Sequence, residues 1–471
     1  MMYELPLDIE NSINATLNAN FDFEAEDSSI GIPAKRPDGK LYNMPILEGV
    51  NVLTVGVTGT GKTKSFILPA ARALLEANKR RKGVFFETKV DFLKKFCGTD
   101  DKVVAYSPFI APSNIFHWNM IMEIKQAGDE AIKKACRRGA TCLDEKNVRQ
   151  IAEEAEMRQI TEALFSDLSA GASDNAIWVE AAKDTFIAAL RVAVNLYPDT
   201  SNKKFVEQLR NMSASAFCKF LAQEQRNNTI LNKNFNYDSK SNKLYTPTKK
   251  ALDILFFLSA VLQRYEGTFA SDGDDTIHDY LHGKYGRNLF LVHDLATAQS
   301  SRPFMIYFLK KIKDEKMSLT STSDLDYPML WCMDEVDKLS DGDTADFGLF
   351  QAATLGREYQ LQILLSTQSL ESLYNLASNE HTANAGLAGF PVYVAFRPGG
   401  DPTTLSILQK LYGSERKTIT TMPISRYDRP MVKSEIEPLV TELDFASLKV
   451  GEAYVKIRQA RPQKVSFVLE T

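Results

Sequence analysis

A glycine-rich octapeptide near the amino terminus has the composition of a phosphate-binding loop. It fits the pattern GxxxxGK[ST] and consists of Gly56, Val57, Thr58, Gly59, Thr60, Gly61, Lys62 and Thr63. Glycines allow successive backbone amides to turn toward phosphate oxygens at the amino end of a helix, whose dipole favours an anion. We expect Lys62 to bridge the β- and γ-phosphates and the hydroxyl of Thr63 to hold Mg²⁺. A turn that only caps a helix is the alternative.

A second group of candidate residues follows an apolar run. Residues 329–333 are apolar, and the adjacent acids Asp334 and Glu335 come directly after them. At the carboxyl edge of a sheet, Asp334 could hold the water shell of Mg²⁺, and Glu335 could orient or deprotonate the attacking water. Taken alone, such a run is equally well explained by a helix cap. Because it follows a phosphate loop in the same chain, we favour the catalytic interpretation.

Two further polar residues flank the next apolar strand, residues 361–366. Gln368 stands just beyond this strand, where it could sense the γ-phosphate or its attacking water; a polar strand end is the alternative. Arg357 precedes the strand and could complete the site of a neighbouring subunit. The alternative for Arg357 is a surface or salt-bridged arginine.

These residues need a sheet to position them, and the pattern of the sequence predicts one. A short apolar strand at 50–55, a helix from Lys62 to about Asn78 and a strand at 83–87 form a strand–helix–strand unit, typical of a parallel α/β sheet. Helical patterns then separate four more short apolar runs, as expected for strands buried on both faces; these runs are 288–293, 328–333, 362–366 and 392–396.

Between about Lys125 and Tyr280 strand patterns nearly vanish, which indicates a mostly helical insertion. Helices are expected at 129–138, 147–168, 176–196, 203–224 and 248–263, with a polar loop at 225–242. We therefore predict an α/β fold in which one nucleotide-type domain is split by an all-α domain. The expected segments are an acidic arm or edge hairpin at 1–45, the first part of the nucleotide-binding domain at 46–124, the all-α domain at 125–285 and the second part at 286–471.

The overall charge limits how this chain could handle nucleic acid. Its 471 residues include 56 Lys plus Arg and 60 Asp plus Glu, for a net charge of −4. A protein that coats DNA through a basic exterior does not have this balance, so any nucleic-acid contact must use a local basic surface. The clusters at 79–82 and 133–138 are candidates, although cations at a helix end or on a solvated face explain them more simply.

The sequence has no targeting signal, membrane span or evident metal site. The first 34 residues contain seven acids and no Lys or Arg, and no apolar run approaches 18 residues, so we expect a cytoplasmic chain. Five scattered cysteines without a CxxC pair suggest neither disulfides nor zinc. His278 and His282 could share a helix face, but without other ligands nearby in the sequence metal binding is not the favoured interpretation.

From about Leu47 to Val468 the sequence resembles the type IV secretion coupling proteins, the TraD/TraG-type conjugative DNA-transfer ATPases. The segments that carry the resemblance include GVTGTGKTKSFILPA at 56–70, IFHWNMI at 115–121, MDEVDKL at 333–339 and LGREYQLQILLSTQSLESLYN at 355–375. By motif position, the residues that match the ATPase residues of the family are Lys62, Thr63, Asp334, Glu335, Arg357 and Gln368; Lys89 matches a family lysine whose role is unassigned.

The resemblance implies a RecA-like P-loop NTPase domain with a mostly parallel sheet, interrupted by an all-α domain. It implies a homo-hexameric ring that hydrolyses ATP with Mg²⁺, receives single-stranded DNA bound to a relaxase, and delivers it to a type IV secretion channel. Family members usually begin with transmembrane helices, which this chain lacks; a separate membrane anchor subunit is one explanation. Two alternatives stay open: another RecA-like translocase of the FtsK/HerA type, and a substrate receptor in which nucleotide acts only as an assembly switch.

Overall fold

The structure is a computed structural model that divides the chain into two compact units. It describes residues 30–105, 114–137, 144–169, 176–238, 241, 243–244, 248–267, 272–318, 325–340, 346–377, 379–421, 431–458 and 460–470. Unit 1 comprises Met1–Glu87 and Tyr327–Thr471, and unit 2 comprises Thr88–Asp326. Most of the acidic arm, residues 1–29, lies outside the described residues. The four-segment division expected from the sequence stays a prediction.

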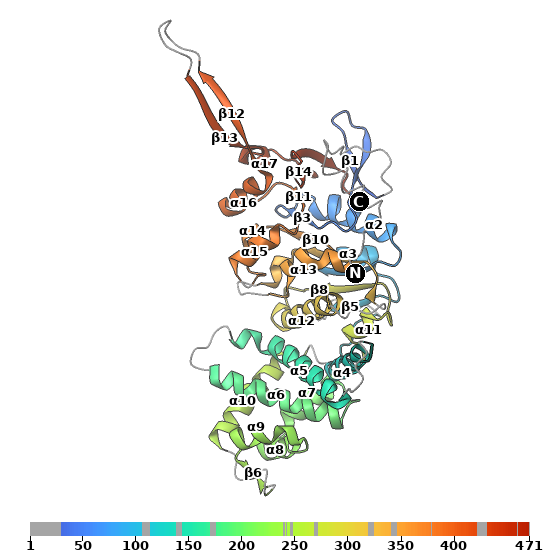
Figure 1. Cartoon of the computed structure of the whole chain (residues 1–471), viewed down its shortest axis with the longest axis vertical. Helices are drawn as coiled ribbons and strands as arrows, with labels where there is room; N and C mark the ends of the chain where they lie inside the picture. Colours follow the sequence, from blue (N-terminus) through green and yellow to red (C-terminus); the bar gives the residue numbers. More distant parts are fainter. Residues whose placement is uncertain are drawn as a thin grey trace. The chain divides into compact units, whose positions relative to one another are not determined.

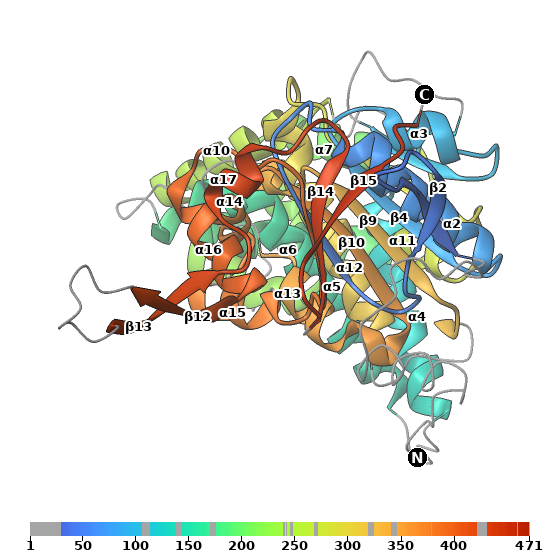
Figure 2. The same cartoon turned by 90° about the horizontal axis from the view of Figure 1, so that it is seen from above.

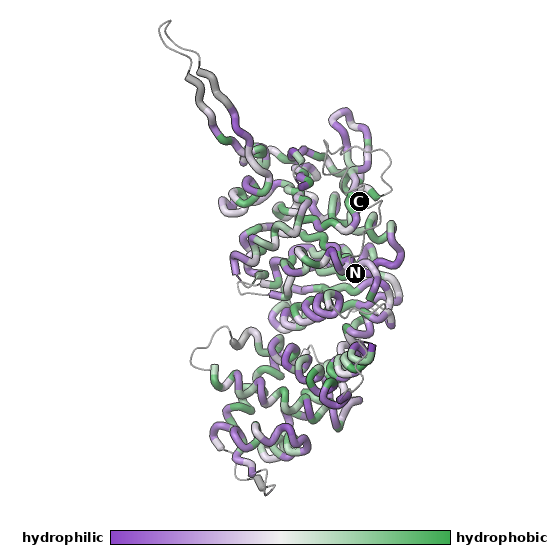
Figure 3. Tube along the Cα trace, viewed as in Figure 1, coloured by the Kyte–Doolittle hydropathy of each residue, from purple (hydrophilic) through white to green (hydrophobic). Residues whose placement is uncertain are grey.

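The centre of unit 1 is a parallel sheet whose strands run in the order β11-β3-β10-β9-β4. The bounds are β3 Val52–Val55, β4 Lys82–Glu87, β9 Met329–Asp334, β10 Leu361–Thr367 and β11 Val392–Ala395. Every residue of β3, β9 and β10 is buried, which explains why these strands are continuous apolar runs rather than alternating ones. Figure 1 labels β3, β10 and β11 in unit 1, and Figure 3 shows the same view coloured by hydropathy. The large, mostly parallel sheet predicted from the sequence is confirmed.

Antiparallel strands extend this sheet beyond β11, in the order β2-β1-β15-β14. The added strands are β1 Gly31–Lys35, β2 Leu41–Pro45, β14 Glu452–Ile457 and β15 Gln463–Phe467. The edge hairpin that was one of the two alternatives for the amino-terminal segment is therefore present at 31–45. A further hairpin, β12 Ser414–Thr421 with β13 Met431–Pro438, runs away from the rest of unit 1 (Figure 1).

Helices cover both faces of the unit 1 sheet. A π-helical turn at Lys62–Ile67 continues into α2 (Leu68–Ala77), which lies on one side of the strands, whereas α14 and α16 lie on the other (Figure 2). The helices after β9 are α13 Leu349–Leu355, α14 Leu370–Tyr374, α15 Glu380–Leu387, α16 Pro402–Tyr412 and α17 Glu442–Ala446. Arg81, one of the cluster at 79–82, is buried and donates to the carbonyl of Leu74 at 2.7 Å. That contact makes it a cap of α2.

Unit 2 is mostly helical, as predicted. Its strands are the parallel pair β5 Lys102–Ala105 and β8 Asn288–Val292 and the short antiparallel pair β6 Tyr237–Asp238 and β7 Lys243–Leu244. Its helices are α3 Asp91–Phe96, α4 Met120–Arg137, α5 Glu145–Ser169, α6 Ala176–Leu196, α7 Asn202–Asn211, α8 Ala214–Leu221, α9 Asn228–Asn234, α10 Lys249–Arg264, α11 Ile277–Leu281 and α12 Ala298–Lys316.

Three details of the helical prediction were wrong. The helix expected at 129–138 begins nine residues earlier, as α4 Met120–Arg137. The single helix expected at 203–224 is two helices, because the side chain of Ser213 accepts a hydrogen bond from the Ala216 amide at 3.2 Å and starts a new helix there. The segment at 225–242, expected to be a loop, contains α9 instead. The sequence pattern did not reveal this helix, because only two of its seven residues, Leu231 and Asn234, are buried, and one of these is polar.

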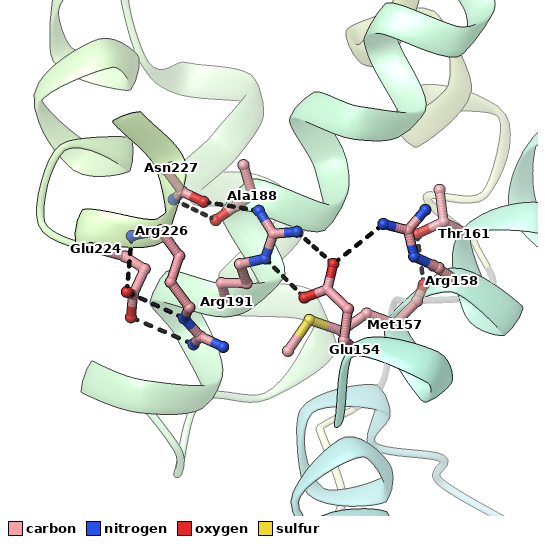
Figure 4. A network of polar contacts seen from close by, with 9 residues as sticks. All are labelled: Glu154, Met157, Arg158, Thr161, Ala188, Arg191, Glu224, Arg226 and Asn227. Carbon is pink, nitrogen blue, oxygen red and sulfur yellow. Dashed lines mark hydrogen bonds and ion pairs between the residues drawn. The ribbon is translucent and has the colours of Figure 1, made fainter. Parts of the chain in front are cut away.

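A polar network joins three helical segments of unit 2 (Figure 4). The guanidinium of Arg191 on α6 donates to both oxygens of Glu154 on α5, at 2.8 Å from Nε, and to Asn227 Oδ1 at 3.1 Å. Burial alone would raise the pKa of Glu154, but the hydrogen bonds and the charge of Arg191 outweigh it and hold that pKa below its ordinary value. Glu154 is therefore a charged tie between α5 and α6.

Among the residues that the structure describes, no helix combines the length and the apolar character that crossing a bilayer requires.

Candidate nucleotide-binding site

The phosphate loop connects the buried end of β3 to the π-helical turn. Three of its glycines have positive φ, 158° at Gly56, 82° at Gly59 and 96° at Gly61, a region that other residues adopt only with strain. The ammonium of Lys62 is buried and donates to the carbonyl oxygens of Gly56 and, at 3.4 Å, of Val57. The loop thus curls around its own lysine at the start of a helix, the arrangement that suits an anion.

Asp334 comes to the loop from the carboxyl end of β9. The hydroxyl of Thr63 donates to Asp334 Oδ2 at 2.7 Å, so two residues far apart in the sequence meet as predicted. The other oxygen, Asp334 Oδ1, is buried and has no hydrogen-bond partner among the described residues. A buried carboxylate oxygen beside a threonine hydroxyl is the oxygen donor set that Mg²⁺ prefers, so the residues present fit this ion.

Glu335 and Gln368 form the second contact of the site. The side-chain amide of Gln368, which follows β10, donates to Glu335 Oε1 at 2.9 Å. Glu335 is 8% exposed and has φ 53°, a left-handed conformation that is unfavourable for a residue with a side chain. Backbone strain of this kind is often found at functional sites. The strained turn directs Glu335 to the end of β10 instead of continuing β9.

Asp337 is a member of this cluster that the sequence did not single out. It is buried, and Thr367 Oγ1 at the end of β10 donates to its Oδ1 at 3.1 Å. Burial raises the pKa of Asp337, partly offset by Lys338 and by the hydrogen bond from Thr367. The contact ties the turn after β9 to the end of β10. The only signal for it in the sequence is its spacing from Glu335.

Backbone amides of the carboxyl-terminal segment, residues 451–470, hydrogen-bond the phosphate loop and the turn after it, a contact that the sequence did not reveal. The amide of Gly451 donates to Thr60 O at 2.9 Å, and the amide of Glu470 donates to Lys64 O at 3.0 Å. Glu470 also pairs with Arg72 on α2 at 2.5 Å. The loop and the turn that follows it are therefore held from outside by the carboxyl-terminal segment.

Arg357 is the predicted site residue that the structure does not bring to this cluster. It lies in the turn Gly356–Tyr359, before β10, at the amino edge of the parallel strands. The seven residues of β10 separate that edge from Gln368 by roughly 20 Å. Arg357 is exposed, and after burial its positive charge is the second cause that lowers the pKa of Arg458. The two arginines therefore stand near each other, away from the phosphate loop of the same chain.

The other cations that the sequence singled out have local partners or lie away from the phosphate loop in the sequence. Lys133 is exposed and lies 3.9 Å from Glu130 on the same helix; Arg138 lies outside the described residues. Lys89 follows β4 and belongs to unit 2. No nucleic-acid surface follows from these residues alone.

Comparison with known proteins identifies a family for the greater part of the chain. Residues 142–463 match the family model described as "Type IV secretion-system coupling protein DNA-binding domain". No curated protein matches the sequence.

Solved structures of bacterial proteins share the fold. The bacterial conjugative coupling protein TrwBdeltaN70, in its unbound form, has a TM-score of 0.63 at 17% identity over 91% of this chain and 87% of its own. TrwB in complex with ADP and Mg²⁺ has a TM-score of 0.62 at 17% identity, covering 91% and 88%. VirB4 of Thermoanaerobacter pseudethanolicus has a TM-score of 0.50 at 12% identity, covering 95% and 98%. These likenesses confirm the RecA-like P-loop fold expected from the sequence. With the family match over residues 142–463, they show that this chain belongs to the type IV secretion-system coupling proteins.

Proposed function

We propose that this coupling protein hydrolyses ATP and uses the energy to recruit and pump single-stranded DNA, or a relaxase–DNA complex, to a type IV secretion channel. The observation that carries the proposal is the pair of contacts at the carboxyl edge of the sheet, Thr63 with Asp334 and Gln368 with Glu335. Solved complexes of TrwB contain an ATP analogue, a GTP analogue, and ADP with Mg²⁺, which supports nucleotide and Mg²⁺ as ligands here.

The phosphate loop binds the triphosphate of ATP in this proposal. Backbone amides of the residues from Thr58 to Thr63 would donate to the phosphates, and Lys62 would exchange its contacts with the loop carbonyls for phosphate oxygens. Thr63 and Asp334 Oδ1 would hold Mg²⁺. When bound, this ion neutralises charge that develops on the phosphate oxygens during transfer.

Glu335 and Gln368 act on the attacking water. Glu335 accepts a hydrogen bond from the water and orients it toward the γ-phosphate, receiving its proton as attack proceeds. The amide of Gln368 fixes the Glu335 carboxylate through the 2.9 Å contact, so Gln368 is a positioning residue. When phosphate leaves, the contact between Gln368 and Glu335 changes. Because Gln368 lies at the end of β10, this change links the nucleotide state to the loops beyond that strand.

Arg357 serves a neighbouring subunit in a homo-hexameric ring. It is exposed at the edge of the sheet opposite the phosphate loop, roughly 20 Å away along β10, so it cannot reach the nucleotide bound by its own chain. A second subunit that presents this edge to the phosphate loop would bring Arg357, with Arg458 beside it, to the γ-phosphate. Hydrolysis would then require assembly.

Single-stranded DNA and a relaxase or another secreted protein are the proposed substrates, and the type IV secretion channel is the partner. The match to a family described as a DNA-binding domain supports this assignment. With a net charge of −4, the DNA contact is confined to local basic surfaces of the assembled ring. We place the protein at the cytoplasmic face of the membrane through its partners, which include a membrane anchor subunit.

Two variants test the catalytic assignment. Lys62→Ala should abolish ATP binding and hydrolysis, whereas Glu335→Gln should bind ATP normally and lose roughly 100-fold or more of its turnover. Glu371→Gln, an exposed acid on α14, is the matched control and should behave as wild type. Full activity of Glu335→Gln would show that the site is assigned incorrectly. Substrate-protein binding that needs ATP without turnover would instead favour the receptor switched by nucleotide.

A further inference from the structure

Two histidines in unit 2 lie together at the short helix α11, His278 within the helix and His282 as the residue that caps its carboxyl end. His278 and His282 are one helical turn apart, and the His282 amide donates to the His278 carbonyl at 2.9 Å. Their rings are separated by 4.1 Å between centroids, with 34° between the ring planes. Both imidazoles therefore face the same side of α11, so the sequence spacing alone places two nitrogen donors side by side.

A third donor comes from a different helix, far away in the sequence. Glu130 on α4 brings a carboxylate oxygen to the two imidazoles, and the three donor atoms lie within 4.8 Å of one another. Glu130 is 6% exposed, His278 is 8% exposed and His282 is half-buried. Glu130 Oε1 is buried without a hydrogen-bond partner among the described residues, while its Oε2 lies 3.9 Å from the exposed Lys133 ammonium. A buried carboxylate oxygen that forms no hydrogen bond is costly unless a ligand compensates it.

We propose that Glu130, His278 and His282 bind a divalent transition-metal ion, with zinc as the best match. Two imidazole nitrogens and one carboxylate oxygen are a donor set that zinc takes, whereas Mg²⁺ and Ca²⁺ prefer oxygen ligands. Bonds of about 2.0–2.2 Å to a shared ion would draw the donor atoms closer than the 4.8 Å that now separates them at most. The half-buried His282 leaves a fourth position for water.

Glu315 on α12 supports this site as a positioning residue. Its Oε2 lies 3.6 Å from His278 Nδ1, and its Oε1 pairs with Lys311 at 2.9 Å. Histidines that bind metals usually donate their other ring N–H to a carboxylate, which fixes the tautomer and the ring orientation. Glu315 can accept the Nδ1 proton of His278 in this way, which leaves Nε2 of His278 as the nitrogen available to the ion.

The helix α4 already holds the other end of α11. Glu123, two turns before Glu130 on α4, accepts hydrogen bonds from the amides of Ile277 at 2.7 Å and His278 at 3.1 Å. An ion bound by Glu130 and the two histidines would add a second attachment toward the end of α11. The proposed ion is therefore structural: it fastens α11 to α4 and stabilises unit 2 by mass action. The proposal does not depend on the ATPase assignment.

The test uses the full chain, freed of metal with a chelator and titrated with Co²⁺ and then Zn²⁺ in the absence of nucleotide. We expect one Co²⁺ per chain with the intense visible absorption of a four-coordinate site, its displacement by Zn²⁺, and a higher unfolding temperature with Zn²⁺ present. His282→Gln should weaken Zn²⁺ binding at least tenfold, and Glu315→Gln by roughly tenfold. His381→Gln, at an exposed position on α15, is the matched control and should bind as wild type.

The spectrum of the wild-type protein decides the question even if a variant fails to fold. The weak absorption of an octahedral oxygen site, or no Co²⁺ binding at all, would overturn the proposal. Equal Zn²⁺ affinity in wild type and a folded His282→Gln protein would overturn it as well.

Discussion

Replacing Gln368 with leucine removes the amide that holds Glu335 and leaves the rest of the site in place. The amide donates to Glu335 Oε1 at 2.9 Å. Because Glu335 is 8% exposed, water is a poor replacement for the lost amide donor. A hydrogen bond to a charged group contributes roughly 1.5–3 kcal/mol. At about 1.36 kcal/mol for each factor of ten in rate, the kcat for ATP hydrolysis should fall roughly 10- to 150-fold. KM should change little, because this amide contacts Glu335 and not the phosphate loop.

The assay for this variant is steady-state ATPase activity with saturating Mg²⁺, measured beside nucleotide affinity. Gln351→Leu makes the same change at an exposed position of α13 and should retain wild-type kcat. A kcat of Gln368→Leu within twofold of wild type would refute the positioning role. A rise in KM with unchanged kcat would do so as well, since it would place the amide in nucleotide binding.

A charged replacement at the same position tests the contact in a second way. Gln368→Glu places a carboxylate beside Glu335, and repulsion between like charges raises the pKa of one of the two groups. The acid limb of the kcat–pH profile should therefore move to higher pH. A limb that stays in place or moves to lower pH would mean that residue 368 does not face Glu335.

Three other changes have defined outcomes. Thr63→Val removes the hydroxyl bonded to Asp334 and should raise the Mg²⁺ concentration needed for half-maximal ATPase activity; an unchanged Mg²⁺ titration contradicts this. Gly61→Ala forces φ 96° on a residue with a Cβ, which would lie 3.1 Å from the Gly451 amide nitrogen, so denaturant unfolding should show a loss of roughly 1–3 kcal/mol. Glu154→Gln should lower the free energy of unfolding by roughly 1.5–3 kcal/mol at pH 7. Because the pKa of Glu154 is depressed in the folded state, the wild-type advantage should be complete above about pH 4.3 and should be lost as the pH falls from there through the lower folded-state pKa. A difference independent of pH refutes the charged tie.

The parallel sheet and the contacts at its edge could be predicted because their physics is local. A strand buried on both faces is a continuous apolar run and can be recognised in the sequence. In a parallel sheet, the residue that follows such a strand lies at the carboxyl edge of the sheet. Asp334, Glu335 and Gln368 stand at the ends of β9 and β10 and follow this rule, whereas Thr63 reaches the same edge through the phosphate loop after β3. The structure pairs Thr63 with Asp334 and Glu335 with Gln368. Their catalytic roles stay predictions.

The features that the sequence did not reveal depend on contacts between distant segments. Nothing in the composition of residues 451–470 indicates that their amides hydrogen-bond the phosphate loop, because backbone groups carry no side-chain signal. The turn that brings Asp337 to Thr367 is likewise set by the left-handed backbone of Glu335. His278 and His282 were visible as a pair, but Glu130 is brought to them only by the packing of α4 against α11.

The most direct test of the central claim is the rate of ATP hydrolysis with and without single-stranded DNA, with oligomeric mass measured in the same samples. The account predicts faster turnover when single-stranded DNA is present, in the samples where subunits assemble, and no turnover under either condition for Glu335→Gln. Turnover that single-stranded DNA leaves unchanged, in fully assembled protein, would contradict the assignment of this chain as a DNA-pumping ATPase.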